Sequence, residues 1–192
     1  MTALLPGPGG RDVLVVAATE AEAAHLPAGV ELLVTGVGKV NAAVATATHL
    51  AAHPSPEQLV VLNVGTAGAL HAGLTGLHLP GRVLNHDFAA APIRALGLLA
   101  EDELVVEHGD ATVLATGDLF VADPVVRDAL AARAQLVDME GFAVAWACHT
   151  AGVAHHLVKH VSDSADESAQ SWPEVVDASA VVLGAWVEAW LG

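Results

Sequence analysis

The stretch from Leu136 to Asp166 limits what this chain can fold into. It contains two apolar segments, each of which ends on carboxylates, and a helix-like segment of about a dozen residues lies between them. The carboxylates are Asp138 and Glu140 after the first segment, and Asp163 and Asp166 after the second. This pattern predicts a strand, a helix and a strand, with acid groups at the carboxyl ends of both strands. Ligands of open α/β sheets bind at those ends, and a carboxyl group against an apolar wall there is a candidate general acid.

The rest of the chain repeats the alternation of strands and helices. Strands are expected at 13–18, 30–35, 59–64, 82–86, 104–107 and 111–115, and helices at 39–53, from 123–124 onward and at 173–191. Such alternation predicts an α/β fold: a three-layer α/β/α arrangement around a central mixed, largely parallel sheet. We expect one domain over residues 1–192, with residues 1–11 loose and the segment 89–102 forming a loop or a lid.

Composition narrows the possible partners. The net charge of −15, with only seven Lys and Arg residues, excludes the cationic footprint of a nucleic-acid binder. No apolar run approaches the roughly 20 residues that span a bilayer, and the N-terminus lacks the features of a secretion signal. One cysteine, Cys148, fits a reducing cytoplasm and is expected to be buried and inert. A hydrophobic content of 54% is high for a monomer of this size and favours a homodimer.

Glycine turns follow two of the expected strands. The segment Gly36-Val-Gly38-Lys39 lacks the spacing of a phosphate-binding loop and indicates a tight turn into a helix. The segment G-T-A-G at 65–68 either lets backbone amides approach a ligand or is an ordinary turn after a strand. The eleven histidines show no metal-binding motif, so we expect neither a metal site nor a cofactor.

Four motifs in order carry a resemblance to a known family. They are T-E-A-E at 19–22, V-G-T-A-G at 64–68, A-T-G-D-L-F at 115–120, and V-D-M-E-G-F-A at 137–143 followed by V-S-D-S-A-D at 161–166. Together they resemble the nucleoside phosphorylase/nucleosidase superfamily, and within it most closely the 5′-methylthioadenosine/S-adenosylhomocysteine nucleosidases. The resemblance covers roughly residues 13–191.

The resemblance implies roles for individual residues. Asp163, beside Ser162, would protonate or hydrogen bond N7 of the departing purine, and Glu22 would position or deprotonate the attacking water. Glu140 would hold the ribose hydroxyls. The remaining positions are binding residues: Met139 lining the sugar pocket, Thr66 and Gly68 near the ribose and the water, and Phe120 stacking on the base.

The chain departs from the family pattern at several places. Lys159 stands four residues before Asp163, where an arginine is usual, and Ala69 follows Gly68 where a second glycine is common. The segment of about 86–110 is shorter than usual, which leaves the identity of the base and of the 5′ substituent open. Asp138 is either a supporting group of the site or a turn residue.

The residues also allow other functions. A nucleoside phosphorylase would need arginines for phosphate, whereas the loop after the first strand carries Glu20 and Glu22. A futalosine-type hydrolase is compatible with M-E-G-F and with Trp172. The departures at Ala69 and Lys159 also keep a non-catalytic nucleoside-binding protein open.

Overall fold

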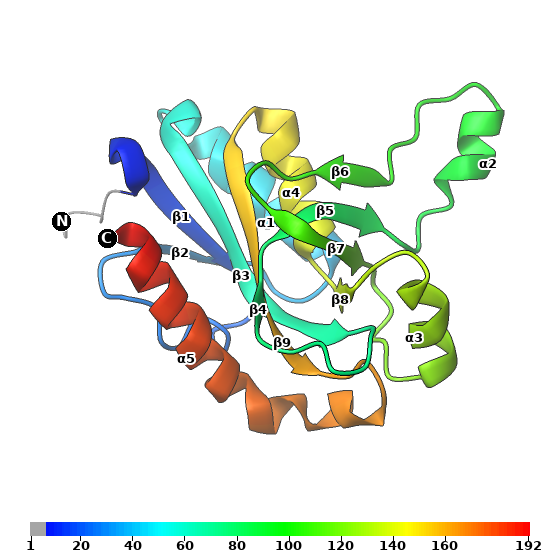
Figure 1. The fold of residues 1–192 in the computed structure, drawn as a ribbon. Coiled ribbons are helices and arrows are strands. Elements are labelled where there is room, and N and C mark those ends of the chain that lie inside the picture. Colours follow the sequence, from blue (N-terminus) through cyan, green and yellow to red (C-terminus); the bar gives the residue numbers. More distant parts are fainter. Residues whose placement is uncertain (1–6) are drawn as a thin grey trace.

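The computed structural model describes residues 7–192, apart from the side chains of residues 168 and 170. A nine-stranded sheet forms its centre (Figure 1). The strands are β1 (Asp12–Ala17), β2 (Glu31–Val34), β3 (Leu59–Ala69), β4 (Leu77–His78), β5 (Pro80–Asn85), β6 (Glu103–Val105), β7 (Asp110–Thr116), β8 (Leu136–Asp138) and β9 (Ala154–Asp163). The helices are α1 (Lys39–Ala52), α2 (Ala90–Ala95), α3 (Pro124–Ala131), α4 (Gly141–Ala151) and α5 (Trp172–Leu191), with short 3₁₀ helices η1 (Pro8–Gly10), η2 (Pro56–Gln58) and η3 (Glu167–Ser171).

The sheet is mixed and largely parallel, as predicted. Its main path runs β2-β1-β3-β8-β7-β5-β6, and β9 pairs with both β3 and β4. The pairs β1–β2, β1–β3, β3–β9, β5–β7 and β7–β8 are parallel. Because β1, β3 and β9 are neighbours and run in the same direction, their carboxyl ends lie at one edge of the sheet.

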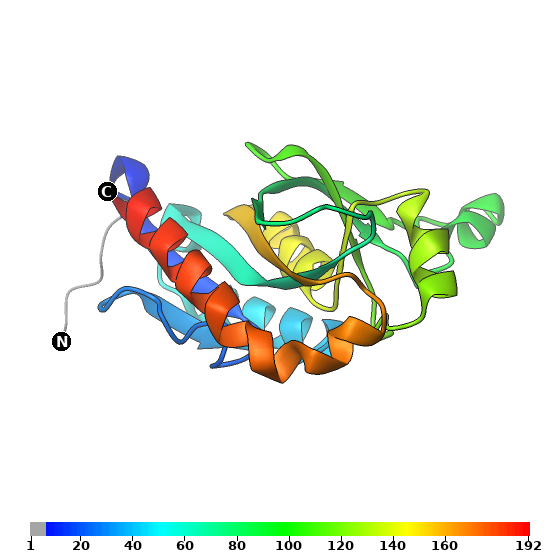
Figure 2. The ribbon, with the colours of Figure 1, turned by 60° about the horizontal axis from the view of Figure 1, so that its bottom comes forward.

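Helices cover both faces of the sheet and make the three layers (Figures 1 and 2). On one face, Leu14 and Val61 pack with residues of α1 and α4, including Leu50 and Val144. On the other face, α5 lays Leu183 and Val187 against alternate residues of β1 and β3. Strands that are buried on both faces in this way read in the sequence as continuous apolar runs, which is why β1 and β3 were recognisable.

The elements agree with the sequence interpretation apart from their lengths and two additions, β4 and α2. β3 continues to Ala69, five residues beyond the expected strand, and β4 was not expected. The segment 89–102, expected to be a loop or a lid, contains the short helix α2, which stands out from the molecule in Figures 1 and 2. Asp123 caps α3 as expected, since its side chain accepts a hydrogen bond of 2.8 Å from the Val125 amide.

The single cysteine of the chain lies in the core, as predicted. Cys148 is buried in α4, and burial raises the pKa of its thiol to about 12, so the thiol is inert at neutral pH.

Among the described residues, no helix is long and apolar enough to cross a membrane.

Gly184 in α5 makes close contact with the loop that follows β1. A Cβ atom at Gly184 would lie 2.1 Å from the carbonyl oxygen of His25. A glycine-to-alanine change inside an exposed helix normally stabilises by about 1 kcal/mol. Here we expect Gly184→Ala to lower the free energy of unfolding by about 2–4 kcal/mol, because backbone must move apart. Urea unfolding measures the change, with Val182→Ala on the exposed side of α5 as the control; a stabilised Gly184→Ala variant would contradict this prediction.

Candidate active site

A cavity of about 200 Å³ opens where the strands β1, β3, β8 and β9 end. The loop after β7 and the first residue of α5 complete its wall. All eight residues proposed from the sequence line it: Glu22, Thr66, Gly68, Phe120, Met139, Glu140, Ser162 and Asp163. The wall also includes apolar side chains, among them Val37, Leu119 and Val137. The structure thus brings together, in one mainly apolar cavity, carboxyl groups that are more than a hundred residues apart in the sequence.

A bulge in β9 places Ser162 and Asp163 side by side in the cavity wall. The parallel pairing of β3 with β9 is regular up to Ala67 and Val161, and then Gly68 pairs with Asp163, so Ser162 is an extra residue. Successive residues of a regular strand point to opposite faces, and a bulge breaks this alternation. The hydroxyl of Ser162 therefore donates to Asp163 Oδ2 at 2.7 Å, while both residues line the cavity.

The turn after β9 fixes the direction of the Asp163 carboxyl group. Its Oδ1 accepts a hydrogen bond of 2.8 Å from the amide of Ala165, a buried residue with a positive φ of 49°. Gly68 makes room for this arrangement: a Cβ atom there would lie 3.0 Å from both Asp163 Oδ1 and Ala165 Cβ. Asp163 thus stabilises the turn after β9 and lines the cavity at the same time.

Glu22 is buried and accepts four hydrogen bonds from two threonines. Thr66 gives its amide and its hydroxyl to Oε1, at 2.8 and 2.9 Å. Thr19 gives its amide and its hydroxyl to Oε2, at 3.2 and 3.1 Å. Donors on both oxygens fix the plane and the direction of the carboxylate. Glu20, two residues earlier, is exposed to solvent.

Glu140 occupies the start of α4 but does not cap that helix with its side chain. Its Oε1 instead accepts a hydrogen bond of 2.7 Å from the amide of Gly38, at the start of α1. Gly38 has a φ of 96°, which glycine adopts readily, so the G-V-G-K turn serves to present this amide. Burial, followed by the nearby charge of Asp138, raises the pKa of Glu140 to about 7.

Asp138, which lines the cavity, forms a buried ion pair with Lys159. Lys159 Nζ lies 2.9 Å from Asp138 Oδ2, and the two side chains are only 2% and 1% exposed. Asp138 also accepts from the Thr116 hydroxyl at 2.6 Å and from the Gly141 amide at 2.9 Å. Burial alone would lower the pKa of Lys159, but Asp138, Glu140 and Glu22 outweigh it and hold that pKa above its ordinary value. Asp138 is therefore a supporting group of the site and not merely a turn residue.

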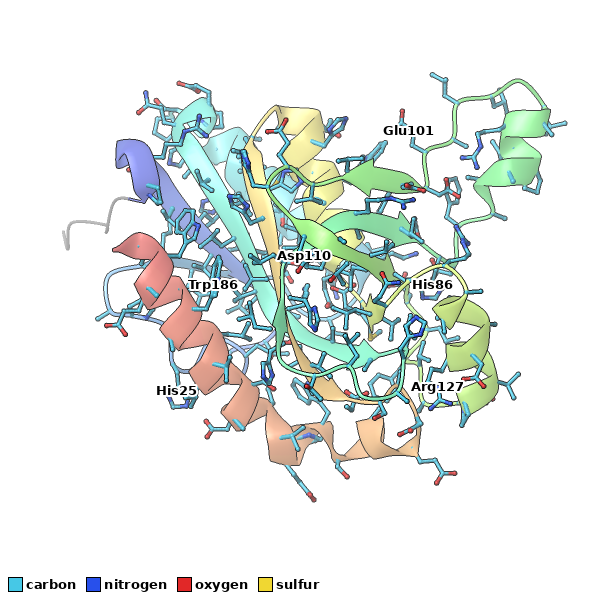
Figure 3. The ribbon with its side chains drawn as sticks, in the orientation of Figure 1. His25, His86, Glu101, Asp110, Arg127 and Trp186 are labelled. Carbon is cyan, nitrogen blue, oxygen red and sulfur yellow. The ribbon has the colours of Figure 1, made fainter. Side chains whose placement is uncertain are left out.

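A second polar cluster lies next to the cavity, and three of its residues, Lys39, Asn85 and Asp118, line a neighbouring groove. Lys39 Nζ donates to Asn85 Oδ1 at 2.8 Å and to Asp87, and the Lys39 amide donates to Asp118 Oδ1 at 2.8 Å. The Asp118 amide in turn donates to Asp87 Oδ2 at 2.8 Å. These bonds connect the start of α1 with the loops after β5 and β7, and so hold the Gly38 amide beside the segment that carries Phe120. His86, labelled in Figure 3, packs closely on Gly117. A Cβ atom at position 117 would lie 2.2 Å from His86 Nε2.

Sequence reasoning missed parts of the site that no acid motif marks. The Gly38 amide, the apolar side chains of Val37 and Leu119, and the placement of Trp172 in the wall became visible only in the structure. Only the Gly38 amide had a signal in the sequence, namely the two glycines of the G-V-G-K turn. Lys159 was noted as a departure from the family pattern, but its ion pair with Asp138 was not foreseen.

The fold and the site define a class of protein: an α/β protein of the nucleoside phosphorylase and nucleosidase kind. A profile of the phosphorylase superfamily matches residues 94–189. A 5′-methylthioadenosine/S-adenosylhomocysteine nucleosidase of Bacillus cytotoxicus is 33% identical over 176 residues, which cover 78% of this chain and 75% of the relative. A 5′-methylthioadenosine/S-adenosylhomocysteine nucleosidase of Marinomonas sp. is 33% identical over 180 residues, and the alignment covers 79% of this chain and 75% of the relative. The chain therefore belongs to the phosphorylase superfamily.

Solved structures share the fold. A Helicobacter pylori MTAN mutant with 5′-methylthioadenosine in its active site aligns with a TM-score of 0.80 at 22% identity, covering 95% of this chain and 98% of the other. The native futalosine hydrolase of Helicobacter pylori aligns with a TM-score of 0.79 at 21% identity, covering 94% and 97%. At such identities the likeness concerns the fold.

The raised pKa of Glu140 predicts how stability depends on pH. A carboxyl group whose pKa rises from 4.5 to about 7 on folding contributes stability below pH 4.5, and this contribution is lost as pH rises through about 7. Glu140→Gln cannot ionise but can still accept from Gly38. We expect the wild type, relative to this variant, to lose on the order of 2 kcal/mol of unfolding free energy between pH 5 and pH 8. Denaturant unfolding at both pH values checks this, and a wild type that gains stability relative to the variant would show the sign to be wrong.

Proposed function

We propose that this protein hydrolyses the N-glycosidic bond of 5′-methylthioadenosine and S-adenosylhomocysteine and releases adenine. The comparisons support hydrolysis of a nucleoside N-glycosidic bond, since the curated relatives are nucleosidases. The observation that carries the proposal is the convergence of Glu22, Glu140 and Asp163 on one small, mainly apolar cavity. Such a cavity suits a nucleoside without phosphate groups, because its acid groups would repel phosphate.

Each carboxyl group has a part in the proposed reaction. The oxygen of a water molecule forms a bond with C1′ of the ribose, the bond from C1′ to N9 breaks, and its electron pair leaves with the base. Glu22 takes a proton from the water, and Asp163 gives a proton to N7 of the base. Glu140 accepts hydrogen bonds from the ribose hydroxyls, and in its ionised form it stabilises the positive charge that develops on the sugar. Proton exchange with solvent then restores Glu22 and Asp163.

The wall of the cavity favours water over phosphate as the nucleophile. None of the described residues that line it is an arginine or a lysine, and the ammonium group of Lys159 is paired with Asp138. A phosphorylase must hold a phosphate dianion next to C1′, which requires cationic side chains or a set of free backbone amides. A futalosine-type substrate remains the second candidate, because the structure of a futalosine hydrolase shares the fold.

Replacing the proposed acid tests the assignment. We expect Asp163→Asn to reduce the rate of base release about 10²–10⁴-fold, because asparagine cannot donate the proton while its Oδ1 still accepts from Ala165. The measurement is adenine release from 5′-methylthioadenosine, S-adenosylhomocysteine and futalosine, each with and without phosphate. Asp177→Asn on the exposed side of α5 is the matched control. Full activity of Asp163→Asn would remove Asp163 from the mechanism, and a requirement for phosphate would favour the phosphorylase.

We further propose that the working form is a homodimer. Next to the cavity, a groove of about 750 Å³ lies between α1, α4 and the segment that carries α2, and it is lined by Val40, Phe88, Leu99 and Trp146. Val40 is 72% exposed and Leu99 is 99% exposed. Two copies of a chain with a net charge of −15 repel each other in general, so an apolar face is the place where they can meet.

Charges placed on this face should separate the copies. We expect Val40→Glu and Leu99→Glu each to weaken self-association roughly 100-fold or more, since two-fold symmetry would bring like charges together in an apolar interface. Sedimentation velocity over a range of concentrations measures the effect. Val181→Glu, on the exposed side of α5, is the control with the same change of charge. A monomeric wild type at micromolar concentration would disprove the dimer.

A further inference from the structure

Trp172, the first residue of α5, lines the cavity and also donates a hydrogen bond to a side chain of the site. Its indole Nε1 lies 2.8 Å from the hydroxyl oxygen of Thr66, and the same hydroxyl lies 2.9 Å from Glu22 Oε1. An indole N–H can only donate, and a carboxylate can only accept. The single hydroxyl proton of Thr66 must therefore point to Glu22, and the chain of hydrogen bonds has one direction, from Trp172 through Thr66 to Glu22.

We propose that Trp172 is a positioning residue for Glu22, acting through the hydroxyl of Thr66; this rests on the proposed function, in which Glu22 receives the proton of the attacking water. A threonine hydroxyl that rotates freely can turn its proton to Glu22 or to the attacking water. With Trp172 donating to it, the Thr66 hydroxyl keeps its proton directed toward Glu22 Oε1. Together with the Thr66 amide at 2.8 Å, it holds that oxygen in place.

The position of Trp172 explains how a residue of a C-terminal helix reaches the end of β1. Pro173 follows it in the first turn of α5, where proline suits the start of a helix. The body of α5 packs on β1 and β3 through Leu183 and Val187, so the helix is anchored and its first residue lies over the cavity. Figure 3 shows Trp186, farther along α5, on the side of that helix that faces the sheet.

Replacing the indole by an aromatic ring without a hydrogen-bond donor separates the two roles of Trp172, its hydrogen bond to Thr66 and its apolar contact with the cavity. Trp172→Phe keeps an aromatic wall and loses the N–H, and Thr66→Val keeps the shape and loses the hydroxyl. We expect each to lower kcat about tenfold with KM changed less than about threefold, and the double variant to fall no further than the single ones. Thr66→Ser should restore kcat, and Trp186→Phe, the same change on the same helix, should leave it unchanged. If Trp172→Phe keeps full kcat, or if the two losses multiply, the inference is wrong.

A measurement that needs no turnover tests the hydrogen bond itself. The chain has four tryptophans, and the indole N–H signal that disappears from the ¹⁵N–¹H spectrum of Trp172→Phe belongs to Trp172. We expect Thr66→Val to shift this signal and to speed its exchange with solvent, and Thr66→Ser to leave both nearly unchanged. An unaltered signal in Thr66→Val would refute the inference whatever the activity. A wild type that releases no base refutes the proposed function and this inference together, whereas an active wild type with an unaltered signal refutes only the inference.

Discussion

The ammonium group of Lys159 is buried close to the carboxyl groups of Asp138, Glu140 and Glu22, and the electrostatics of the site depend on it. Taking a charge out of water costs several kcal/mol unless a partner of opposite charge and hydrogen bonds compensate it. Asp138 provides both, at 2.9 Å. Because β8 carries Asp138 and β9 carries Lys159, this ion pair also fixes the two strands whose ends supply Glu140 and Asp163.

The three carboxyl groups near Lys159 differ in the partners that surround them. Asp138 holds the ammonium group directly, and Glu22 is compensated by four donors from Thr19 and Thr66. Glu140 has the Gly38 amide, and burial and the charge of Asp138 raise its pKa to about 7. A group that exchanges its proton near neutrality is suited to gripping hydroxyl groups, since it can meet them as acceptor or donor.

Much of the fold and of the site could be predicted because acid groups follow buried strands at recognisable places. Continuous apolar runs marked β1 and β3. The motifs around Glu140 and Asp163 marked the ends of β8 and β9. The Gly38 amide and the indole of Trp172 could not be predicted in this way, because backbone donors and a tryptophan near a helix start have no distinctive sequence pattern. The Asp138–Lys159 contact depends on the register of two strands, which the sequence alone does not determine.

The extra residue in β9 has a consequence for how such a site can change over time. With Ser162 present, two consecutive side chains line the cavity, whereas a chain without it would pair Asp163 with Gly68 in a regular register and lose the hydroxyl that donates to Asp163. A single codon deletion would thus change the surroundings of the Asp163 carboxyl group, while the residues of β9 up to Val161 would keep their pairing with β3.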